Sequence, residues 1–314
     1  MMFPNQIILK FNKRLHTKED QEMLHQIKKD IFNMSLDVAI TMKKYFKTIY
    51  KMSDVTTTKN LSYFNFRGET INKYVQNNII KVPKDAVKID ERDDYCYYKG
   101  LELVCKKFYK IKNIRLYTNY TYILKDITNR KFTVVEPVDE VEIKLDLNLL
   151  KKHFKLPYCS TVHSVQGLSI DEEICIFDCN TPYVDRNFIY TAVTRARELK
   201  NVTYFHHSDN EIKRLEESRK LQYLKLKING YKIQDMDAKR DFKRESFIDV
   251  SWFNEAINNT DRCPLCNNSF YMVLDENNTI MCNITVDRMD SSIPHHKDNC
   301  HLLCQDCNAS KGKR

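Results

Sequence analysis

The feature that most restricts the fold of this chain is an alternation of short apolar strands with polar turns and helices in residues 158–205. A strand near Cys159 leads into the turn STVHSVQG, which Gly167 closes, because glycine favours the position after a helical turn. The strand EICIFD comes next, followed by a helix. Apolar residues repeat along that helix at i, i+3, i+4 and i+7, and they are Ile189, Ala192, Val193 and Ala196. This succession predicts an α/β fold.

Polar side chains of this stretch gather in two places. The first turn carries hydrogen-bonding groups on Thr161, His163, Ser164 and Gln166. In the helix, 100° per residue places Arg195 away from the apolar stripe, so we expect its guanidinium to be free for an anion.

Together the two groups resemble motifs V and VI of superfamily 1 helicases. The second RecA-like domain of that family carries a T-x-H-x-x-QG turn, then a strand, then a helix ending in TRAR. The resemblance implies nucleic-acid binding by the first turn, nucleotide contact at Gly167 and catalytic roles for two side chains. The nucleic-acid-binding residues would be Thr161, His163 and Ser164, and the catalytic ones Gln166 and Arg195, the latter at the γ-phosphate. Ser169 stands where many members have an acid, and an ordinary α/β core with polar loops is the alternative.

The N-terminal part extends the resemblance. Residues 5–10 form an expected strand, FNKR follows, and a helical stretch capped by Thr17 comes next. This order is similar to motif IV, in which Arg14 would be a second catalytic arginine; a solvated basic loop is the alternative. A later strand-to-helix segment resembles the one after motif IV, and its polar residues Asn65, Thr70 and Asn72 could meet a nucleic-acid backbone.

Glycine is scarce in this chain. Its five glycines are too far apart for a GxxxxGK phosphate loop. The resemblance therefore implies that ATP and magnesium would bind only with a first RecA-like domain. We expect that domain, with its Walker A and B motifs, on a separate polypeptide or an upstream segment.

Between the two helicase-like regions, about residues 86–145, short β-rich runs are punctuated by turns. The runs are AVKI, DYCYY, LELVC, YTYILKDI, KFTVV and VEIKL. They predict a small barrel, and superfamily 1 relatives insert an SH3-like barrel at this point. Its tyrosines could stack on bases, although core packing is the commoner use of strand aromatics.

Length and composition limit the number of domains, the kind of partner and the location of the protein. The chain has 314 residues, enough for two or three domains, and 42% of them are hydrophobic. A formal charge of +9 suits a polyanionic partner such as DNA, single-stranded or duplex. No apolar run approaches a membrane span and the N-terminus lacks a secretory pattern, so we expect no membrane partner and an intracellular location, cytoplasmic or at a viral replication site.

Four cysteines near the C-terminus form two C-x-x-C pairs. They are Cys263 with Cys266, and Cys304 with Cys307. A two-residue spacer lets both thiolates of a pair reach one tetrahedral zinc ion, so the spacing predicts a structural zinc site. Four unliganded core cysteines are the alternative.

Between and after these pairs, TVDRMD, KDN and CNASKGK resemble the HNH, or ββα-metal, nuclease fold. The resemblance implies that Asp287 and Asn308 bind a catalytic Mg²⁺ or Mn²⁺ and that Asn299 orients the reacting groups. Arg288 stands at the usual histidine position, and an arginine cannot take up a proton. His295, or else His296, is the expected base; a catalytically silent, DNA-binding zinc module is the alternative.

The sequence thus predicts an α/β protein with three parts. Residues 1–207 form a second RecA-like domain with the inserted barrel, and residues 255–314 form a zinc-bound HNH-like domain. Residues 208–254 form a helical linker between them, and its first helix stops at Asn229–Gly230. The expected function is the C-terminal portion of an ATP-dependent DNA helicase joined to an HNH-like nuclease domain. A non-enzymatic nucleic-acid binder with remnant helicase motifs is the alternative. The fusion and the Lys/Asn/Tyr-rich composition are similar to proteins of large DNA viruses.

Overall fold

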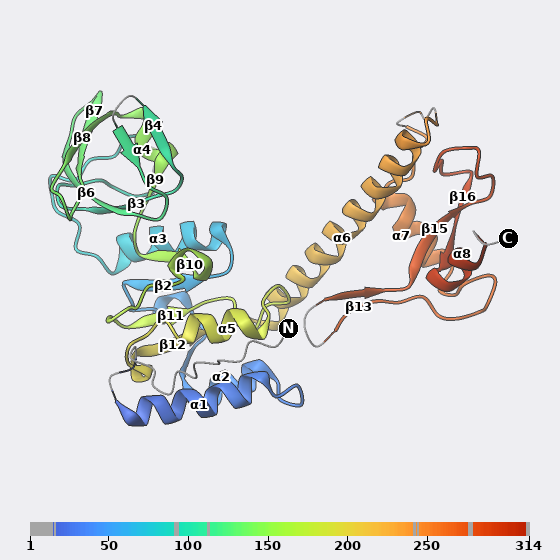
Figure 1. The fold of residues 1–314 in the computed structure, drawn as a ribbon, viewed down its shortest axis with the longest axis horizontal. Helices are drawn as coiled ribbons and strands as arrows, with labels where there is room; N and C mark the ends of the chain where they lie inside the picture. Colours follow the sequence, from blue (N-terminus) through green and yellow to red (C-terminus); the bar gives the residue numbers. More distant parts are fainter. Residues whose placement is uncertain are drawn as a thin grey trace, which may run out of the picture. The chain divides into compact units, whose positions relative to one another are not determined.

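A computed structural model of the chain describes residues 15, 17–90, 94–111, 114–240, 243, 245–275 and 279–311. The chain divides into two compact units, which are described separately below (Figure 1). Unit 1 comprises residues 1–180 and 186–207, and unit 2 comprises residues 181–185 and 208–314. The strand expected at residues 5–10 and the side chain of Arg14 lie outside the described residues.

Unit 1 is built on a five-stranded sheet in the order β1-β12-β11-β2-β10, in which every neighbouring pair is parallel. Its strands are β1 (Lys47–Ile49), β2 (Lys59–Ser62), β10 (Cys159–Thr161), β11 (Ile174–Ile176) and β12 (Val202–Phe205). Every residue of β11 is buried, as expected for the centre of a parallel sheet. The α/β fold is therefore confirmed, and all five strands end at one edge of the sheet.

Helices surround this sheet. They are α1 (Lys18–Phe32), α2 (Val38–Tyr45), α3 (Asn65–Asn78) and α5 (Arg186–Val193), with short 3-10 turns η1 (Met52–Asp54), η2 (Val162–Val165) and η3 (Leu199–Asn201). Thr17 caps α1 as predicted, its Oγ1 accepting from the Asp20 amide at 3.0 Å. The end of α1 is closed by buried Arg186, which donates to the Asn33 and Leu36 carbonyls at 3.0 and 2.9 Å. Figure 1 shows α3 beside β2 and β10.

A β-rich insert separates α3 from β10 in the sequence. Its main sheet is antiparallel, in the order β8-β7-β6-β3-β9, and β4 and β5 form a separate hairpin. The elements are β3 (Glu102–Cys105), β4 (Tyr109–Ile111), β5 (Ile114–Leu116), β6 (Thr121–Ile127), β7 (Lys131–Val135), β8 (Glu142–Asp146), α4 (Asn148–His153) and β9 (Phe154–Lys155). The four expected runs from LELVC to VEIKL are strands, whereas AVKI and DYCYY supply only the bridge between Val87 and Tyr97.

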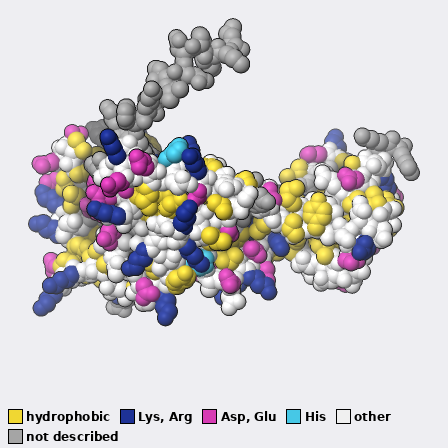
Figure 2. Space-filling model, turned by 90° about the horizontal axis from the view of Figure 1, so that it is seen from below, with side chains coloured by type: hydrophobic (Ala, Val, Ile, Leu, Met, Phe, Trp, Pro, Cys, Tyr) yellow, Lys and Arg dark blue, Asp and Glu magenta, His cyan; other side chains and the backbone are white. Residues whose placement is uncertain are grey.

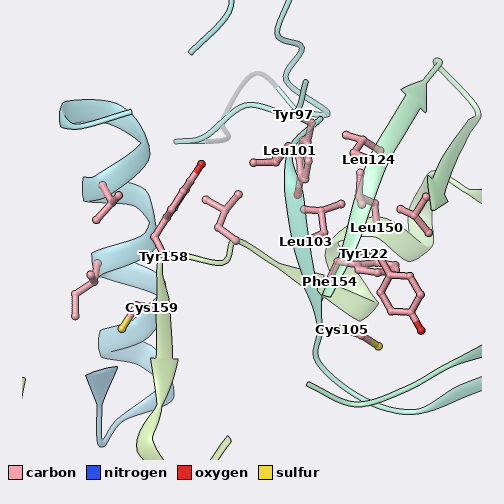
Figure 3. Packing of buried hydrophobic residues seen from close by; sticks show 14 of the residues in the cluster. Tyr97, Leu101, Leu103, Cys105, Tyr122, Leu124, Leu150, Phe154, Tyr158 and Cys159 are labelled. Atoms are coloured by element: carbon pink, nitrogen blue, oxygen red, sulfur yellow. The ribbon is translucent and has the colours of Figure 1, made fainter. Parts of the chain in front are cut away.

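One hydrophobic core joins the insert to the parallel sheet. Figure 3 shows Leu103, Tyr122 and Phe154 within the insert, and Tyr158 and Cys159 next to the neighbouring helix. Tyr97 and Tyr122 are buried, with exposures of 3% and 1%, so these two rings pack rather than stack on bases. Tyr117, in contrast, is 50% exposed.

The main segment of unit 2 begins with a long helix, α6 (Asp209–Asp237). The predicted stop at Asn229–Gly230 is wrong, because the helix continues for two further turns. A glycine inside a helix costs only about 1 kcal/mol. The turns beyond it bring Tyr231 and Asp235 into the interior, where the Tyr231 hydroxyl accepts from the Val286 amide at 3.0 Å. Those tertiary contacts outweigh the local preference.

The rest of unit 2 is small and layered. It contains α7 (Val250–Asn259), the antiparallel pair β13 (Met272–Leu274) and β14 (Ile280–Cys282), the antiparallel pair β15 (Ile284–Arg288) and β16 (Cys300–Cys304), and α8 (Gln305–Lys311). One core combines Leu224 and Tyr231 of α6, Phe253 of α7 and Val286 of β15. Residues 208–254, expected as a linker, thus contribute side chains to the same core as the hairpin.

Charge is spread over the surface. In the face that Figure 2 presents, basic and acidic side chains are interspersed, so the formal charge of +9 does not form one continuous patch there. Within the described residues, no helix has both the length and the apolar character that a membrane crossing requires.

Candidate functional site

The polar turn after β10 lies at the carboxyl edge of the parallel sheet, where α/β proteins commonly bind ligands. Val162 and Val165 are buried and anchor the turn, while His163, Gln166 and Gly167 are exposed and Thr161 and Ser164 are half-buried. Ser164 Oγ donates to the Thr161 carbonyl at 2.8 Å. Gly167 has φ +91°, a conformation that a side chain would strain. The sequence thus predicted this turn correctly.

The two helicase-like turns are joined by backbone hydrogen bonds. The Ile170 amide donates to the Arg195 carbonyl at 2.8 Å, and the Arg197 amide donates to the Ile170 carbonyl at 3.0 Å. The structure therefore brings the first turn and the end of α5 together, although they are separated in the sequence by β11.

The expectation of a free Arg195 guanidinium is wrong. Arg195 is only 6% exposed, and it follows α5 rather than lying on its surface. Its Nε and Nη1 donate to the Thr191 and Leu168 carbonyls at 2.9 and 3.1 Å, and Nη2 donates to Thr194 Oγ1 at 3.0 Å. The helical rotation was continued past the residue at which the helix ends, so it gave the wrong direction for this side chain.

A pocket of about 280 Å³ opens beside the first turn. Thr161 and Ser164 line it together with Asn65 of α3 and two lysines of the insert, Lys106 and Lys155. Burial lowers the pKa of Lys155, and no ion pair within the described residues involves it. An anion in this pocket would offset the cost of burying that ammonium group. The two lysines were missed from the sequence, because Lys106 follows β3 and Lys155 ends β9, far apart along the chain.

Asn72, expected at a nucleic-acid backbone, has a structural position instead. It is 4% exposed, and its Oδ1 accepts from the amides of Tyr158 and Cys159 at 2.9 and 3.0 Å. It therefore fastens α3 to β10, the strand that carries the polar turn. Thr70 donates to the Phe66 carbonyl of its own helix.

A buried carboxylate organises the loops at the same sheet edge. Asp178 follows β11 and is fully buried, with φ +68°. Its Oδ2 accepts from the Tyr63 amide at 2.9 Å, and its Oδ1 lies 3.2 Å from Arg67 Nε and from His207 Nε2. It therefore links the loops that follow β2, β11 and β12. The sequence signal was an acid directly after the apolar strand EICIF.

Comparison with known proteins agrees with this arrangement. Residues 156–203 match the UvrD-like helicase C-terminal domain. The match covers β10, the polar turn, β11 and α5, and it supports the resemblance to the C-terminal part of superfamily 1 helicases. No curated protein matches the chain.

Several solved Pif1 helicases are similar to this chain at low sequence identity. Pif1 helicases coordinating at forked duplex DNA are 15% identical, with a TM-score of 0.41 and coverage of 63% of this chain and 49% of theirs. Bacteroides Pif1 with ADP-AlF3 and single-stranded DNA is 17% identical, with a TM-score of 0.40 and coverage of 61% and 49%. Candida albicans Pif1 is 10% identical, with a TM-score of 0.37 and coverage of 65% and 58%. The chain spans about half the length of these proteins.

In unit 2, beyond the UvrD-like segment, the four predicted cysteines converge. The sulfur atoms of Cys263, Cys266, Cys304 and Cys307 all lie within 4.8 Å of one another. Burial opposes ionisation of the Cys263 thiol, but hydrogen bonds from nearby backbone amides, that of Cys304 foremost, outweigh it and lower its pKa to about 6. Four cysteine sulfur atoms this close together fit a tetrahedral zinc ion, so the cysteines can hold zinc.

The β15–β16 hairpin has two different faces. Ile284, Val286 and Leu302 pack into the core with α6 and α7. Alternation then turns Thr285 and Asp287 to the opposite face, where α8 lies. There Asn308 Nδ2 donates to Thr285 Oγ1 at 3.1 Å. The structure thus brings the two expected metal ligands, Asp287 and Asn308, to the same face of the hairpin.

Asp287 has two basic neighbours that were not expected from the sequence. His301 is its cross-strand partner, with Nε2 at 3.2 Å from Asp287 Oδ2. Lys311 of α8 places Nζ 2.7 Å from the same oxygen. The only sequence signal was the register of the hairpin, which the long connection between its strands leaves undetermined.

The expected catalytic role of His295 conflicts with its position. Its side chain is 4% exposed, its Nδ1 lies 2.8 Å from Asp235 Oδ2, and its ring stacks on Tyr231 at 4.8 Å. Arg288 also contacts Asp235, at 3.2 Å. Because Arg288 alternates with Asp287 along β15, His295 belongs to the core-facing side of the hairpin, opposite to Asp287.

Asn299 also has a structural role. It is 7% exposed, and its Oδ1 accepts from the Asp290 amide while its Nδ2 donates to the Asp290 carbonyl, both at 2.9 Å. Its amide group therefore fixes the connection between β15 and β16. His296 forms a backbone bridge with Phe247.

Proposed function

We propose that unit 1 is the second RecA-like domain of a superfamily 1 DNA helicase, with an SH3-like barrel as its insert. The observation that carries this proposal is the backbone pairing of Ile170 with Arg195 and Arg197 at the carboxyl edge of a parallel sheet. It joins the nucleic-acid turn to the arginine turn in the segment that matches the UvrD-like domain. The match and the pairing favour a helicase over a binder with remnant motifs.

The proposed strand site is the pocket beside η2. Thr161 and Ser164 supply hydroxyl groups, and Lys106 and Lys155 supply positive charge in the same pocket. Side-chain hydroxyls and lysines are common partners of the phosphate backbone, which they hold without reading sequence. His163 is exposed at the start of the same turn and supplies a further donor or a stacking surface.

The proposed nucleotide site needs a first RecA-like domain, which would supply the phosphate loop and the magnesium carboxylate. ATP with Mg²⁺ would provide the phosphoryl chemistry at the junction of the two domains. From this chain, Gln166 and Gly167 would face the nucleotide and Arg195, with Arg14, would stabilise charge on the phosphates. Arg195 would have to exchange its contact with the Leu168 carbonyl for a phosphate oxygen. Movement of the strand-binding turn would therefore change the position of the Arg195 guanidinium directly.

Binding of a fluorescein-labelled oligothymidylate, followed by anisotropy over a series of salt concentrations, tests the strand site. The double variant Lys106→Ala/Lys155→Ala should bind more weakly and lower the salt slope by about two. The matched control removes two exposed lysines of the same insert, Lys131 and Lys144. Equal loss in both double variants would show that general charge, and not the pocket, binds the strand.

For unit 2 we propose a zinc-stabilised, HNH-like nuclease module. The support is the order of elements, an antiparallel hairpin followed by α8, with Asp287 and Asn308 directed to the same face. Zinc on the four cysteines would be structural, whereas Mg²⁺ or Mn²⁺ near Asp287 would stabilise charge on a scissile phosphate. His295 is not part of the proposed site, because its buried ring pairs with Asp235 on the core-facing side of the hairpin, opposite to Asp287.

The alternative for unit 2 is a DNA-binding zinc module without catalysis. Two of the basic residues that would bind DNA already form ion pairs within the chain. Lys297 pairs with Asp249 at 2.6 Å, and Lys311 pairs with Asp287 at 2.7 Å. Nicking of supercoiled plasmid with Mg²⁺ or Mn²⁺ separates the two functions. Asp287→Ala should abolish nicking while zinc content and DNA affinity persist, and intact protein that binds DNA but never nicks it would leave only the alternative.

A further inference from the structure

The face of the hairpin that carries Asp287 also holds a histidine in a suitable position for a metal. Asp287 Oδ2 and His301 Nε2 are 3.2 Å apart, and they come from directly opposed positions of β15 and β16. Cross-strand neighbours in an antiparallel pair share one face, so these two atoms can reach the same ion without a change of fold. The His301 side chain is 36% exposed, which leaves it room to turn.

A third donor lies beside this pair. Asn308 and Lys311 are three residues apart in α8 and therefore face the same way. The amide nitrogen of Asn308 is held by Thr285 Oγ1, two residues before Asp287 on the same face of β15. Within the described residues no hydrogen bond reaches the amide oxygen of Asn308, so that atom is available to a ligand.

Lys311 already compensates the charge of Asp287. The carboxylate is 11% exposed, and the ammonium group lies 2.7 Å from Oδ2. A carboxylate this shielded from water needs a positive partner. The lysine side chain is itself 48% exposed, so it can swing into solvent when another cation takes its place.

We propose that His301 is a ligand of a divalent metal ion, together with Asp287 and Asn308, and that Lys311 closes the site when the ion is absent. The inference rests on the nuclease function proposed for unit 2, and it adds an imidazole to the two oxygen ligands that the family resemblance implies. Imidazole nitrogen favours first-row transition ions, whereas Mg²⁺ prefers an all-oxygen shell. The site should therefore bind Mn²⁺ more tightly than Mg²⁺.

Mn²⁺ is a suitable probe because it is paramagnetic and competes poorly for thiolates, so the cysteine site keeps its zinc. The full chain, loaded with zinc, would be titrated with MnCl2 and the free ion followed by electron paramagnetic resonance. Electron spin echo envelope modulation of the bound ion then detects a coordinated imidazole through its ¹⁴N coupling. We expect one site per chain with this coupling.

Three variants make the test specific. His301→Ala should lose the ¹⁴N coupling and about tenfold or more in Mn²⁺ affinity. Lys311→Met should move the affinity in the opposite direction, because the competing ammonium group is gone, and this gain cannot come from misfolding. His25→Ala removes an exposed histidine of unit 1 and should change neither quantity. Zinc content is measured for each protein.

The proposal is overturned if the wild-type chain binds no Mn²⁺, if the bound ion lacks ¹⁴N coupling, or if the coupling survives in His301→Ala. Plasmid nicking measured in parallel separates this result from the nuclease proposal. Mn²⁺ bound through His301 without any nicking would support the metal site and refute the nuclease. Nicking with unchanged Mn²⁺ affinity in His301→Ala would refute the ligand and leave the nuclease in place.

Discussion

Replacement of Arg195 should loosen the turn that contacts nucleic acid, even in the absence of nucleotide. Among the hydrogen bonds of the guanidinium, the one to the Leu168 carbonyl, at 3.1 Å, crosses from the end of α5 to that turn. A buried hydrogen bond from a charged donor contributes about 1.5–3 kcal/mol. Arg195→Ala should therefore lower the free energy of local opening in residues 167–170 by that amount.

Amide hydrogen exchange measures this opening directly. The Ile170 amide is the reporter, because it donates to the Arg195 backbone carbonyl at 2.8 Å and is retained in the variant. Since about 1.4 kcal/mol corresponds to a tenfold change in an equilibrium constant, its exchange should accelerate by roughly 10- to 150-fold. A peptide covering residues 166–172, followed by mass spectrometry, resolves an effect of this size.

Arg197→Ala is the matched control. This neighbouring arginine forms an exposed ion pair with Asp171 at 3.2 Å, with 42% and 67% of the two side chains exposed. Exposed pairs contribute about 0–1 kcal/mol, so exchange at Ile170 should rise by no more than about fivefold. Equal exchange in the two variants would refute the claim that Arg195 holds the turn.

Four further outcomes follow from other contacts. Asn72→Ala leaves the buried amides of Tyr158 and Cys159, at the start of β10, without this acceptor and should destabilise unit 1 by about 2–4 kcal/mol, measured by urea unfolding. Asp235→Asn should destabilise unit 2 by about 3–5 kcal/mol, with the single tryptophan as the fluorescent probe. Chelation of zinc should increase hydrogen exchange around the cysteine cluster, checked against metal content. A hydrogen bond from Lys44, followed in size by one from Tyr45, lowers the pKa of Asp30 from 3.8 to about 2. The Lys44–Asp30 pair therefore stabilises the folded protein above about pH 4 and loses this effect as the pH falls toward 2. The difference in thermal stability between wild type and Lys44→Met should shrink over the same range.

Local patterns predicted the parts of the molecule that neighbouring residues determine. Gly167 marked a turn that requires positive φ, and Thr17 marked the start of α1. The spacing of the cysteines predicted a cluster whose sulfur atoms do converge. In each case the physical cause lies within a few residues, so the sequence contains it.

Long-range contacts determined the features that were mispredicted. Gly230 continues a helix because Tyr231 and Asp235 pack against the hairpin, which follows some 50 residues later. His295 was expected beside Asp287, but its backbone amide and its ring Nδ1 both hydrogen-bond to the carboxylate of Asp235 on α6. No spacing in the sequence indicates that partner.

His301 is a residue that the sequence analysis missed for the same reason, because its position depends on long-range contacts. Strand alternation alone would have separated Asp287 from Arg288, since adjacent strand residues face opposite ways. Identifying His301 as the neighbour of Asp287 also needs the register of β15 and β16, which the intervening connection sets through the hydrogen bonds of Asn299. That register is a tertiary property, so the histidine had no signal of its own.

Burial and hydrogen-bond partners divide the polar residues of both candidate sites into two groups with different expected effects. Asn72 and Asn299 are buried, and their side-chain amides bond to backbone groups, so their replacement should change stability first. Thr161 and His301 keep exposed surface beside a pocket or a carboxylate, so their replacement should change ligand binding at nearly constant stability. Arg195 belongs to both groups, because it is buried and also hydrogen-bonds to the turn that we propose binds the nucleic-acid strand. Its replacement should therefore change the stability of that turn and the response to nucleotide together, which neither group alone would do.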